Sequence, residues 1–213
     1  MPVAVGIRRE DKNEWERRAP LIPADAAKLH TAQGLRILIQ PSAIRIYRDE
    51  QYREAGVEVS DDLGPAQMIL AIKEIPIAAI SPGKIYVFFA HVVKGQAFNM
   101  PMLSRLLELG CTLVDYEKIV DDQNRRLIFF GRHAGYAGMV ETLWCLGRRL
   151  EQQGLRIPLS QVKHAYEYHD LDAAKGHLSD LGKQILRVGL APALRPLVIG
   201  ISGYGRKAAY TDP

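Results

Sequence analysis

Short apolar segments alternate with polar, helix-forming segments along the first part of the chain. The apolar runs that we expect to form strands are residues 3–7, 35–39, 57–59, 68–72, 85–89 and 112–116. The segments that we expect to form helices are residues 24–33, 49–55 and 102–109, each followed by a glycine that can end a helix. Several strands are apolar throughout, which is typical of a parallel sheet covered on both faces. This order predicts an α/β fold: a doubly wound, three-layer, Rossmann-like (flavodoxin-like) N-terminal domain, which we place at residues 1–132.

The pattern changes after this domain. Residues 136–153 are expected to form a long helix, with Met139, Leu143, Leu146 and Leu150 at helical spacing, and residues 171–186 a second one. We expect residues 133–195 to be linking helices between two domains. Three glycines lie in residues 130–138, where close packing is the simpler interpretation and a hinge between domains the alternative.

Near the C-terminus an apolar run from Pro196 leads into Gly203-Tyr-Gly205-Arg-Lys-Ala208. This is the G-x-G-x-x-G/A turn of a dinucleotide-binding βαβ unit, in which Gly203 would permit the tight turn and Gly205 the approach of a pyrophosphate. An ordinary strand-to-loop turn is the alternative. The sequence stops before the acidic residue expected about 20 residues further on. We therefore expect residues 196–213 to be the start of a truncated NAD(P)-binding Rossmann domain that binds neither NAD nor NADP by itself.

The charge and cysteine content narrow the classes of partner. The formal net charge is +4, but basic and acidic residues are interspersed, as in Arg8-Arg9-Glu10-Asp11-Lys12, which favours a solvated face over a nucleic-acid stripe. Cys111 and Cys145 lie in apolar runs without metal-ligand spacing, so we expect buried thiols and no metal site. No signal peptide opens the chain and no apolar run approaches membrane-spanning length. These features predict a soluble, cytoplasmic protein.

Two polar residues follow the two most apolar strands. Lys73 comes directly after residues 68–72, and His91 follows residues 85–90. In open α/β sheets ligands bind at the carboxyl ends of the strands, so two parallel strands would present both side chains at one edge. A histidine titrates near neutrality and a partly desolvated lysine can be shifted into the working range, so the pair could move protons. Taken singly, a surface lysine and a hydrogen-bonded core histidine remain the alternatives.

Arg17 and Arg18 lie in the loop after the first strand, at the same predicted edge. A guanidinium there could hold a carboxylate through two hydrogen bonds. A surface ion pair with Glu14 or Glu16 is the alternative.

Six stretches of the chain resemble a known family: Gly6–Glu10, Trp15–Leu21 with Pro23, Ile72-Lys-Glu74, Phe88–His91 with Lys94-Gly-Gln and Asn99-Met100, Asp115–Lys118, and Phe130–Met139. Together they resemble the alanine dehydrogenase/transhydrogenase N-terminal domain. They are most similar to its lysine–ketoglutarate reductase and lysine-forming saccharopine dehydrogenase branch.

The resemblance implies an oxidoreductase that interconverts saccharopine with lysine and 2-oxoglutarate using NAD or NADP. Lys73 and His91 would then be the acid/base residues, which take the proton of the secondary amine and assist hydrolysis of the imine. Arg18 would hold a substrate carboxylate, and Gly203 and Gly205 would approach the cofactor. The sequence after Gly205 matches the family poorly.

Two other functions stay open at this point. One is an alanine dehydrogenase-like enzyme that acts on another amino acid, and the other is a noncatalytic module that binds an amino acid or a partner protein. For the leading interpretation the expected partner is a small-molecule substrate, saccharopine or lysine plus 2-oxoglutarate, with no nucleic acid and no membrane. We expect residues 196–201 to form an apolar strand of the kind that is buried in a parallel sheet, so exposure of this strand would favour self-association.

Overall fold

A computed structural model gives the structure of the chain and describes residues 3–190 and 192–202. The chain divides into two compact units, Met1–Phe129 and Phe130–Pro213. Each unit is described by itself.

The first unit is built on a six-stranded parallel sheet, which confirms the predicted α/β fold. The strands are β1 (Ala4–Ile7), β2 (Arg36–Ile39), β3 (Glu58–Val59), β4 (Met68–Leu70), β5 (Ile85–Phe88) and β6 (Thr112–Asp115). Their order is β3-β2-β1-β4-β5-β6, and every neighbouring pair is parallel. Of the two common doubly wound orders this is the Rossmann one, and not the flavodoxin-like 2-1-3-4-5.

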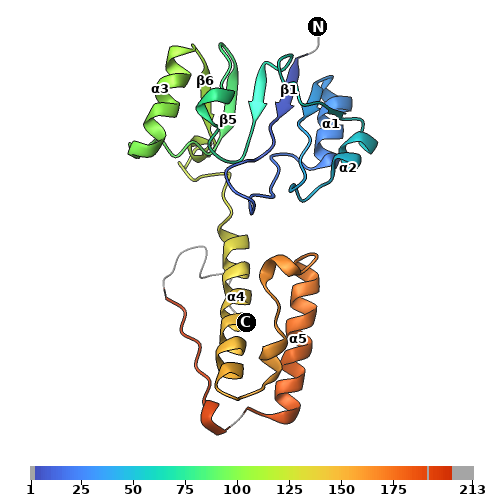
Figure 1. Cartoon of the computed structure of the whole chain (residues 1–213), viewed down its shortest axis with the longest axis vertical. Coiled ribbons are helices and arrows are strands. Elements are labelled where there is room, and N and C mark those ends of the chain that lie inside the picture. Colours follow the sequence, from blue (N-terminus) through green and yellow to red (C-terminus); the bar gives the residue numbers. More distant parts are fainter. Residues whose placement is uncertain (1–2, 191, 203–213) are drawn as a thin grey trace. The chain divides into compact units, whose positions relative to one another are not determined.

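Helices cover both faces of the sheet and complete the three layers (Figure 1). The helices α1 (Pro23–Gln33) and α2 (Asp49–Glu54) bury Ala26 and Tyr52 against Ile7 and Ile39. The helix α3 (Met100–Glu108) and the short 3₁₀ helices η1 (Ile77–Ala79) and η2 (Ala97–Asn99) belong to the other side, where Met102 and Leu106 pack with Phe88. A third cluster, around Phe89 and Tyr116, lies next to the 3₁₀ helix η3 (Tyr116–Lys118).

Local sequence signals account for the ends of the elements. Pro23 occupies the first position of α1, where its missing N–H costs nothing, and Gly34 ends the helix in the left-handed region at φ 64°. The last three strands, β4, β5 and β6, are shorter than predicted at their carboxyl ends. β4, for example, ends at Leu70, so Ala71 and Ile72 form part of the turn that leads to Lys73.

The sheet has its topological switch point between β1 and β4. The chain passes from β3 at one edge to β4 on the far side of β1, and residues 60–67 make this connection without a helix. In a doubly wound sheet the loops that follow the two strands at this point diverge and leave a crevice for ligands.

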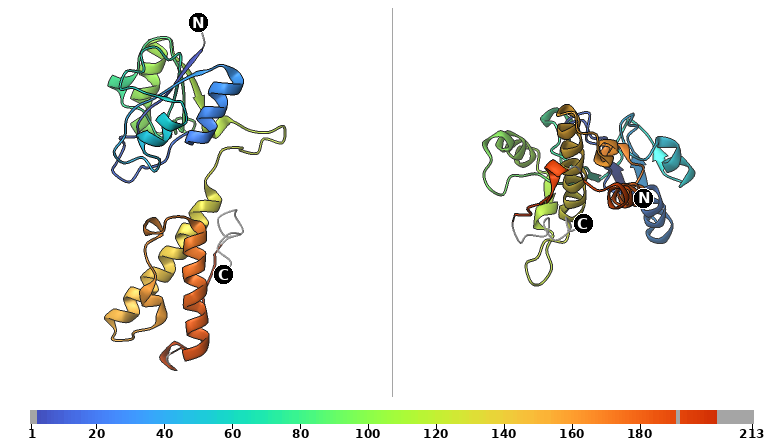
Figure 2. Two further views of the ribbon diagram at one scale, coloured as in Figure 1. Left: turned by 90° about the vertical axis from the view of Figure 1, so that its right-hand side faces the viewer. Right: turned by 90° about the horizontal axis from the view of Figure 1, so that it is seen from below.

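The second unit consists of two long helices that run side by side (Figures 1 and 2). They are α4 (Gly131–Gln152), which begins five residues earlier than predicted, and α5 (Leu171–Val188). The short 3₁₀ helices η4 (Pro158–Gln161), η5 (Ala165–Glu167) and η6 (Pro192–Leu194) complete the unit. Its core contains Val140 from α4, Leu159 and Val162 from the connection, and Leu181 from α5.

The predicted strand at residues 196–201 is wrong for the described part of the chain. These residues form no helix or strand, and Val198 is 79% exposed. A strand requires a hydrogen-bonded neighbour, and no strand of the described residues pairs with this segment. Ile199 instead lines an apolar groove of about 570 Å³ between α4 and α5. Gly203 and Gly205 lie outside the described residues.

The cysteines differ from their predicted burial. Cys111 is partly buried and its Sγ lies 3.3 Å from the carbonyl oxygen of Ser81, but Cys145 is exposed. The apolar run around Cys145 is part of α4, and a helix turns every fourth side chain or so toward solvent even in such a run. Within the described residues no helix is long and apolar enough to cross a membrane.

Candidate active site

The carboxyl edge of the sheet brings Lys73 and His91 to neighbouring strands. β4 and β5 are adjacent and parallel, and the N–H of Phe89 donates to the carbonyl oxygen of Ile72 at 3.1 Å. Lys73 is the next residue after Ile72, and His91 comes two residues after Phe89. Lys73 and His91 therefore both come directly after this hydrogen bond, at the carboxyl edge of the sheet.

Glu74, which the sequence analysis did not single out, is bound to three side chains at this edge. Its Oε1 lies 2.8 Å from Nδ1 of His91 and accepts a longer hydrogen bond, 3.3 Å, from Nδ2 of Asn99. Its Oε2 accepts a hydrogen bond from Nζ of Lys12 at 2.6 Å. Asn99 is itself held by the carbonyl oxygen of Ala90 at 2.9 Å. Glu74 thus joins the loops after β1, β4 and β5.

The charge of Glu74 determines which ring nitrogen of His91 carries the proton. Burial works to raise the pKa of Glu74, but the hydrogen bonds from Lys12, His91 and Asn99 outweigh it and lower the pKa to about 2. An ionised carboxylate only accepts hydrogen bonds, so Nδ1 of His91 carries the proton in this contact. The neutral ring then presents Nε2 as an acceptor, and Nε2 has no hydrogen-bond partner among the described residues.

The backbone of His91 is also unusual. Its φ is 50°, in the left-handed region that residues other than glycine rarely adopt. Such a conformation costs roughly 1–3 kcal/mol, and residues held in it cluster at active sites and ligand-binding sites. The ring of His91 lies over that of Phe89, with centroids 6.3 Å apart, and Phe89 meets Tyr116 edge to face at 5.0 Å. An aromatic wall therefore supports one side of the histidine.

Lys73 is fixed through its backbone. The carboxylate of Glu10, in the loop after β1, accepts the N–H of Ile72 at 2.7 Å and the N–H of Lys73 at 2.9 Å. The ammonium group of Lys73 makes no hydrogen bond or ion pair with any described residue. Its charge reaches Glu16, where it helps to lower the pKa of that carboxyl. The lysine is thus held at its main chain while its amine stays available.

Arg18 pairs with Glu16, one of the two partners considered for it. Nε donates to Oε1 at 2.7 Å and Nη2 to Oε2 at 2.5 Å, so the pair is bidentate. Burial works to raise the pKa of Glu16, but the hydrogen bonds and charge of Arg18 outweigh it and the pKa falls below its ordinary value. Glu16 is 7% exposed and Arg18 41% exposed. The carboxylate therefore anchors a guanidinium that remains accessible to solvent.

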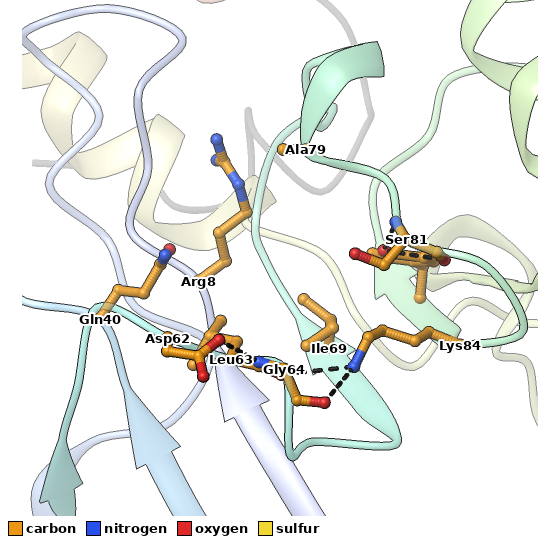
Figure 3. Close-up of a pocket in the computed structure, with 10 residues that line it drawn as sticks. Arg8, Gln40, Asp62, Leu63, Gly64, Ile69, Ala79, Ser81 and Lys84 are labelled. Atoms are coloured by element: carbon orange, nitrogen blue, oxygen red, sulfur yellow. Dashed lines mark hydrogen bonds between the residues drawn. The ribbon is translucent and has the colours of Figure 1, made fainter.

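A separate cavity of about 280 Å³ lies in the same unit (Figure 3). Its basic groups already have partners, since Arg8 binds the carboxylate of Asp11 and Nζ of Lys84 donates to the carbonyl oxygens of Leu63 and Gly64. Neither Lys73, His91 nor Arg18 lines it. We therefore place the candidate site at the carboxyl edge and not in this cavity.

Comparison with models of protein families shows which family the chain belongs to. The model of the alanine dehydrogenase/PNT N-terminal domain matches residues 6–137, which is more than half of the chain. The chain belongs to this family. The resemblance that we inferred from the sequence motifs is thereby confirmed.

Several relatives come from the predicted branch. An alpha-aminoadipic semialdehyde synthase of Arabidopsis thaliana is 42% identical over 206 residues, and a mitochondrial one of Bos taurus is 38% identical over 202. These alignments cover 94% of this chain but only 19% and 22% of the two proteins, so the chain spans about a fifth of their length. A lysine-forming, NAD(+)-linked saccharopine dehydrogenase of Yarrowia lipolytica is 32% identical over 142 residues, 64% of this chain and 38% of that protein.

A solved L-alanine dehydrogenase structure superposes with a TM-score of 0.57 at 21% identity. The superposition covers 71% of this chain and 42% of that one. At this identity the likeness concerns the fold, and it agrees with the Rossmann-type sheet described above.

Proposed function

We propose that this chain is the substrate-side part of a nicotinamide-dependent oxidoreductase of the saccharopine dehydrogenase/lysine–ketoglutarate reductase type. Such an enzyme acts on the CH–NH bond of saccharopine and interconverts it with lysine and 2-oxoglutarate. The observation that carries the proposal is the His91–Glu74 contact beside Lys73 at the sheet edge. It provides a proton acceptor of defined tautomer next to a second titratable group, as a reaction at an amine requires.

In this proposal His91 and Lys73 move the protons. Nε2 of His91 is the acceptor that the contact with Glu74 leaves facing outward, so it suits removal of the proton from the secondary amine. After water has added to the imine carbon, the ammonium group of Lys73 can donate a proton to the nitrogen as the C–N bond breaks, and the amine of Lys73 takes up the hydroxyl proton as the keto acid forms. Glu74 stays ionised and balances the positive charge that forms on His91 when the histidine takes up a proton.

Arg18 would hold a carboxylate of the substrate. Its pairing with Glu16 fixes the guanidinium in one orientation, and the side chain is 41% exposed. Saccharopine carries several carboxylates, so one such contact would orient the amine relative to Lys73 and His91.

The first unit does not fit the nicotinamide cofactor that accepts the hydride in this reaction. Its first turn is Gly6-Ile-Arg-Arg-Glu10, without the glycine-rich sequence that lets backbone N–H groups approach a pyrophosphate. Within the proposal Gly203 and Gly205 approach the cofactor, and the steps assigned to the described residues are proton transfers only.

The proposed organisation follows from the same assignment. We propose residues 1–132 as the substrate domain, residues 133–195 as linking helices and residues 196–213 as the beginning of the cofactor domain, in a cytoplasmic protein that self-associates through residues 196–201. Cell fractionation and sedimentation of the protein are the direct tests of the last two statements.

Two assays test the proposed function. The first measures binding of saccharopine to this chain, and the second measures turnover by the longest protein that the natural gene encodes, which we call the longest form. Calorimetry should show that the chain binds saccharopine, and that Arg18→Ala weakens binding about tenfold or more, the loss of one charge-assisted contact. In the longest form, saccharopine should reduce NAD or NADP, and Lys73→Met or His91→Gln should each lower kcat by about 10²- to 10⁴-fold. Binding without turnover would support a noncatalytic module. Turnover of alanine in place of saccharopine would support the alanine dehydrogenase-like alternative.

A further inference from the structure

The carboxylate of Glu10 makes backbone hydrogen bonds next to Lys73, and the proton transfers proposed above assign it no role. It belongs to the loop after β1, yet its carboxylate accepts two successive backbone N–H groups, of Ile72 and Lys73, from the turn after β4. The residue is 7% exposed. Glu10 therefore joins the two strands on either side of the switch point, at the position of the lysine.

We propose that Glu10 is a positioning residue, whose carboxylate sets the place of Lys73 in the active site by holding the backbone at Ile72 and Lys73. This inference rests on the proposed function, because it assigns Glu10 a role in the reaction only through Lys73. Glu10 itself contacts main-chain atoms and is not assigned a contact with the substrate.

The shape of the contact requires a carboxylate. Its two oxygens each accept one N–H, at 2.7 and 2.9 Å. Glutamine has nearly the same size, but its amide nitrogen is a donor, so one of the two backbone N–H groups would face another donor and lose its partner. The turn must then shift, and a displacement of about 1 Å at a reacting group can cost on the order of a hundredfold in rate.

Stability alone does not explain a glutamate at this position. Burial raises the pKa of Glu10, and the two backbone hydrogen bonds offset that rise only in part. A carboxyl whose pKa is higher in the folded state stabilises the fold most when protonated, and this stabilisation is lost as the pH rises from 4.5 through the folded pKa. At neutral pH the charge of Glu10 therefore costs stability, as is common for groups kept for function.

The charged and titratable groups around Glu10 come from three elements. Arg8, Glu16 and Arg18 lie in its own loop, Lys73 follows β4, and Tyr116 follows β6. Glu16 raises the pKa of Glu10 and Arg8 lowers it. Burial first, and then the charge of Glu10, raise the pKa of Tyr116 to about 12, so the phenol stays neutral. The surroundings thus leave the two backbone N–H groups as the main partners of the carboxylate.

The first experiment detects the contact in the chain itself. Hydrogen exchange followed by NMR should show slow exchange at the amides of Ile72 and Lys73 in the wild type, and at least about tenfold faster exchange in Glu10→Gln. The matched control is Gln67→Leu. This substitution removes the side-chain acceptor of the N–H of Ala4, at the amino ends of the same two strands, β1 and β4. It should speed exchange at Ala4 only. Unchanged exchange at Ile72 and Lys73 in Glu10→Gln would overturn the inference.

The second experiment asks whether the contact acts through Lys73. In the longest natural form of the protein, Glu10→Gln should lower kcat by about ten- to a hundredfold with a much smaller change in KM. In a Lys73→Met background the same substitution should have little further effect, because the group that it positions is gone. Gln67→Leu should leave kcat within about twofold.

Two results separate this inference from the proposed function. If the wild-type protein turns over saccharopine but Glu10→Gln lowers kcat equally with and without Lys73, Glu10 does not act through the lysine and the inference fails alone. If the wild type does not turn over saccharopine, the proposed function fails, and the hydrogen exchange measurement still decides whether Glu10 holds the turn.

Discussion

Gly147 lies where α4 meets η4, and its replacement by alanine tests the packing of the second unit. A Cβ on Gly147 would lie 2.2 Å from the carbonyl oxygen of Leu159, 2.7 Å from its carbonyl carbon and 3.0 Å from the nitrogen of Ser160. All three are backbone atoms, so no change of rotamer can relieve the clash. η4 would have to move by about 1 Å to restore ordinary contact distances.

The expected cost follows from two opposing effects. Overpacking of this kind costs about 1–3 kcal/mol or more, and alanine is favoured over glycine inside a helix by up to about 1 kcal/mol. η4 is not free to move, because Leu159 is buried in the core and Nη2 of Arg148 donates to the carbonyl oxygen of Ser160 at 2.7 Å. We expect Gly147→Ala to lower the free energy of unfolding of the second unit by about 1–3 kcal/mol.

The control is Gly138→Ala on the same helix. A Cβ there has nothing within 4 Å, so this substitution should raise the free energy of unfolding by up to about 1 kcal/mol. Trp144 of α4 stacks near His164, with ring centroids 3.8 Å apart, so its fluorescence reports on the second unit. The measurement is urea unfolding in a Trp15→Phe background, which removes the other tryptophan of the chain. If Gly147→Ala is as stable as Gly138→Ala, the close approach does not exist in solution.

Four other predictions follow from the structure. Deleting residues 196–213 should leave the first unit folded, because its three core clusters draw on residues between Ala4 and Ile128; loss of cooperative melting of residues 1–129 would contradict this. The chain should bind NAD and NADP more weakly than micromolar, since its sheet lacks the glycine-rich turn, and calorimetry would reveal tighter binding. Glu74 has a pKa of about 2, so the wild type should lose stability as the pH falls from 4.5 toward 2, and Glu74→Gln should lack this loss in urea titrations across that range. Lys84→Met should destabilise the first unit by about 1–3 kcal/mol, because it leaves the carbonyl oxygens of Leu63, Gly64 and Ala66 without this donor; an unchanged urea midpoint would show that water replaces the ammonium group.

The elements that the sequence predicted well are those set by local chemistry. Pro23 fixes φ at the start of α1, and Gly34 can adopt the left-handed conformation at its end, so both boundaries were readable without knowledge of the fold. The apolar strands also identified the parallel sheet, because a strand buried on both faces has no polar positions to alternate. The predicted strand at 196–201 failed for the opposite reason. Its existence depends on a neighbouring strand, which its own residues do not specify.

The candidate site was predictable only in part. Parallel strands end at a common edge, and this placed Lys73 and His91 together before the structure was known. Glu10, Glu74 and Asn99 were missed because their roles depend on where loop side chains turn. Glu74 is adjacent to Lys73 and Glu10 follows β1 at the switch point, so acidic residues next to predicted strand ends were the signal that could have found them. Gly147 was missed because its constraint comes from η4, a separate segment of the chain.

In the proposed enzyme, the residues after the first strand distinguish this Rossmann-type sheet from one that binds a dinucleotide. A dinucleotide requires backbone N–H groups that point at its phosphates after the first strand. Here the corresponding loop carries Glu10, which occupies N–H groups of the next strand's turn, and Glu16, which holds Arg18. Glu74 adds a third carboxylate from the other side of the crevice. Each of these carboxylates is already paired: Glu10 with two backbone N–H groups, Glu16 with Arg18 and Glu74 with Lys12. In the proposed enzyme Arg18 takes a carboxylate of the substrate, while the amine lies toward Lys73 and His91. In the proposed enzyme the same strand order therefore serves substrate in this domain and cofactor in another, and the residues after the first strand decide which.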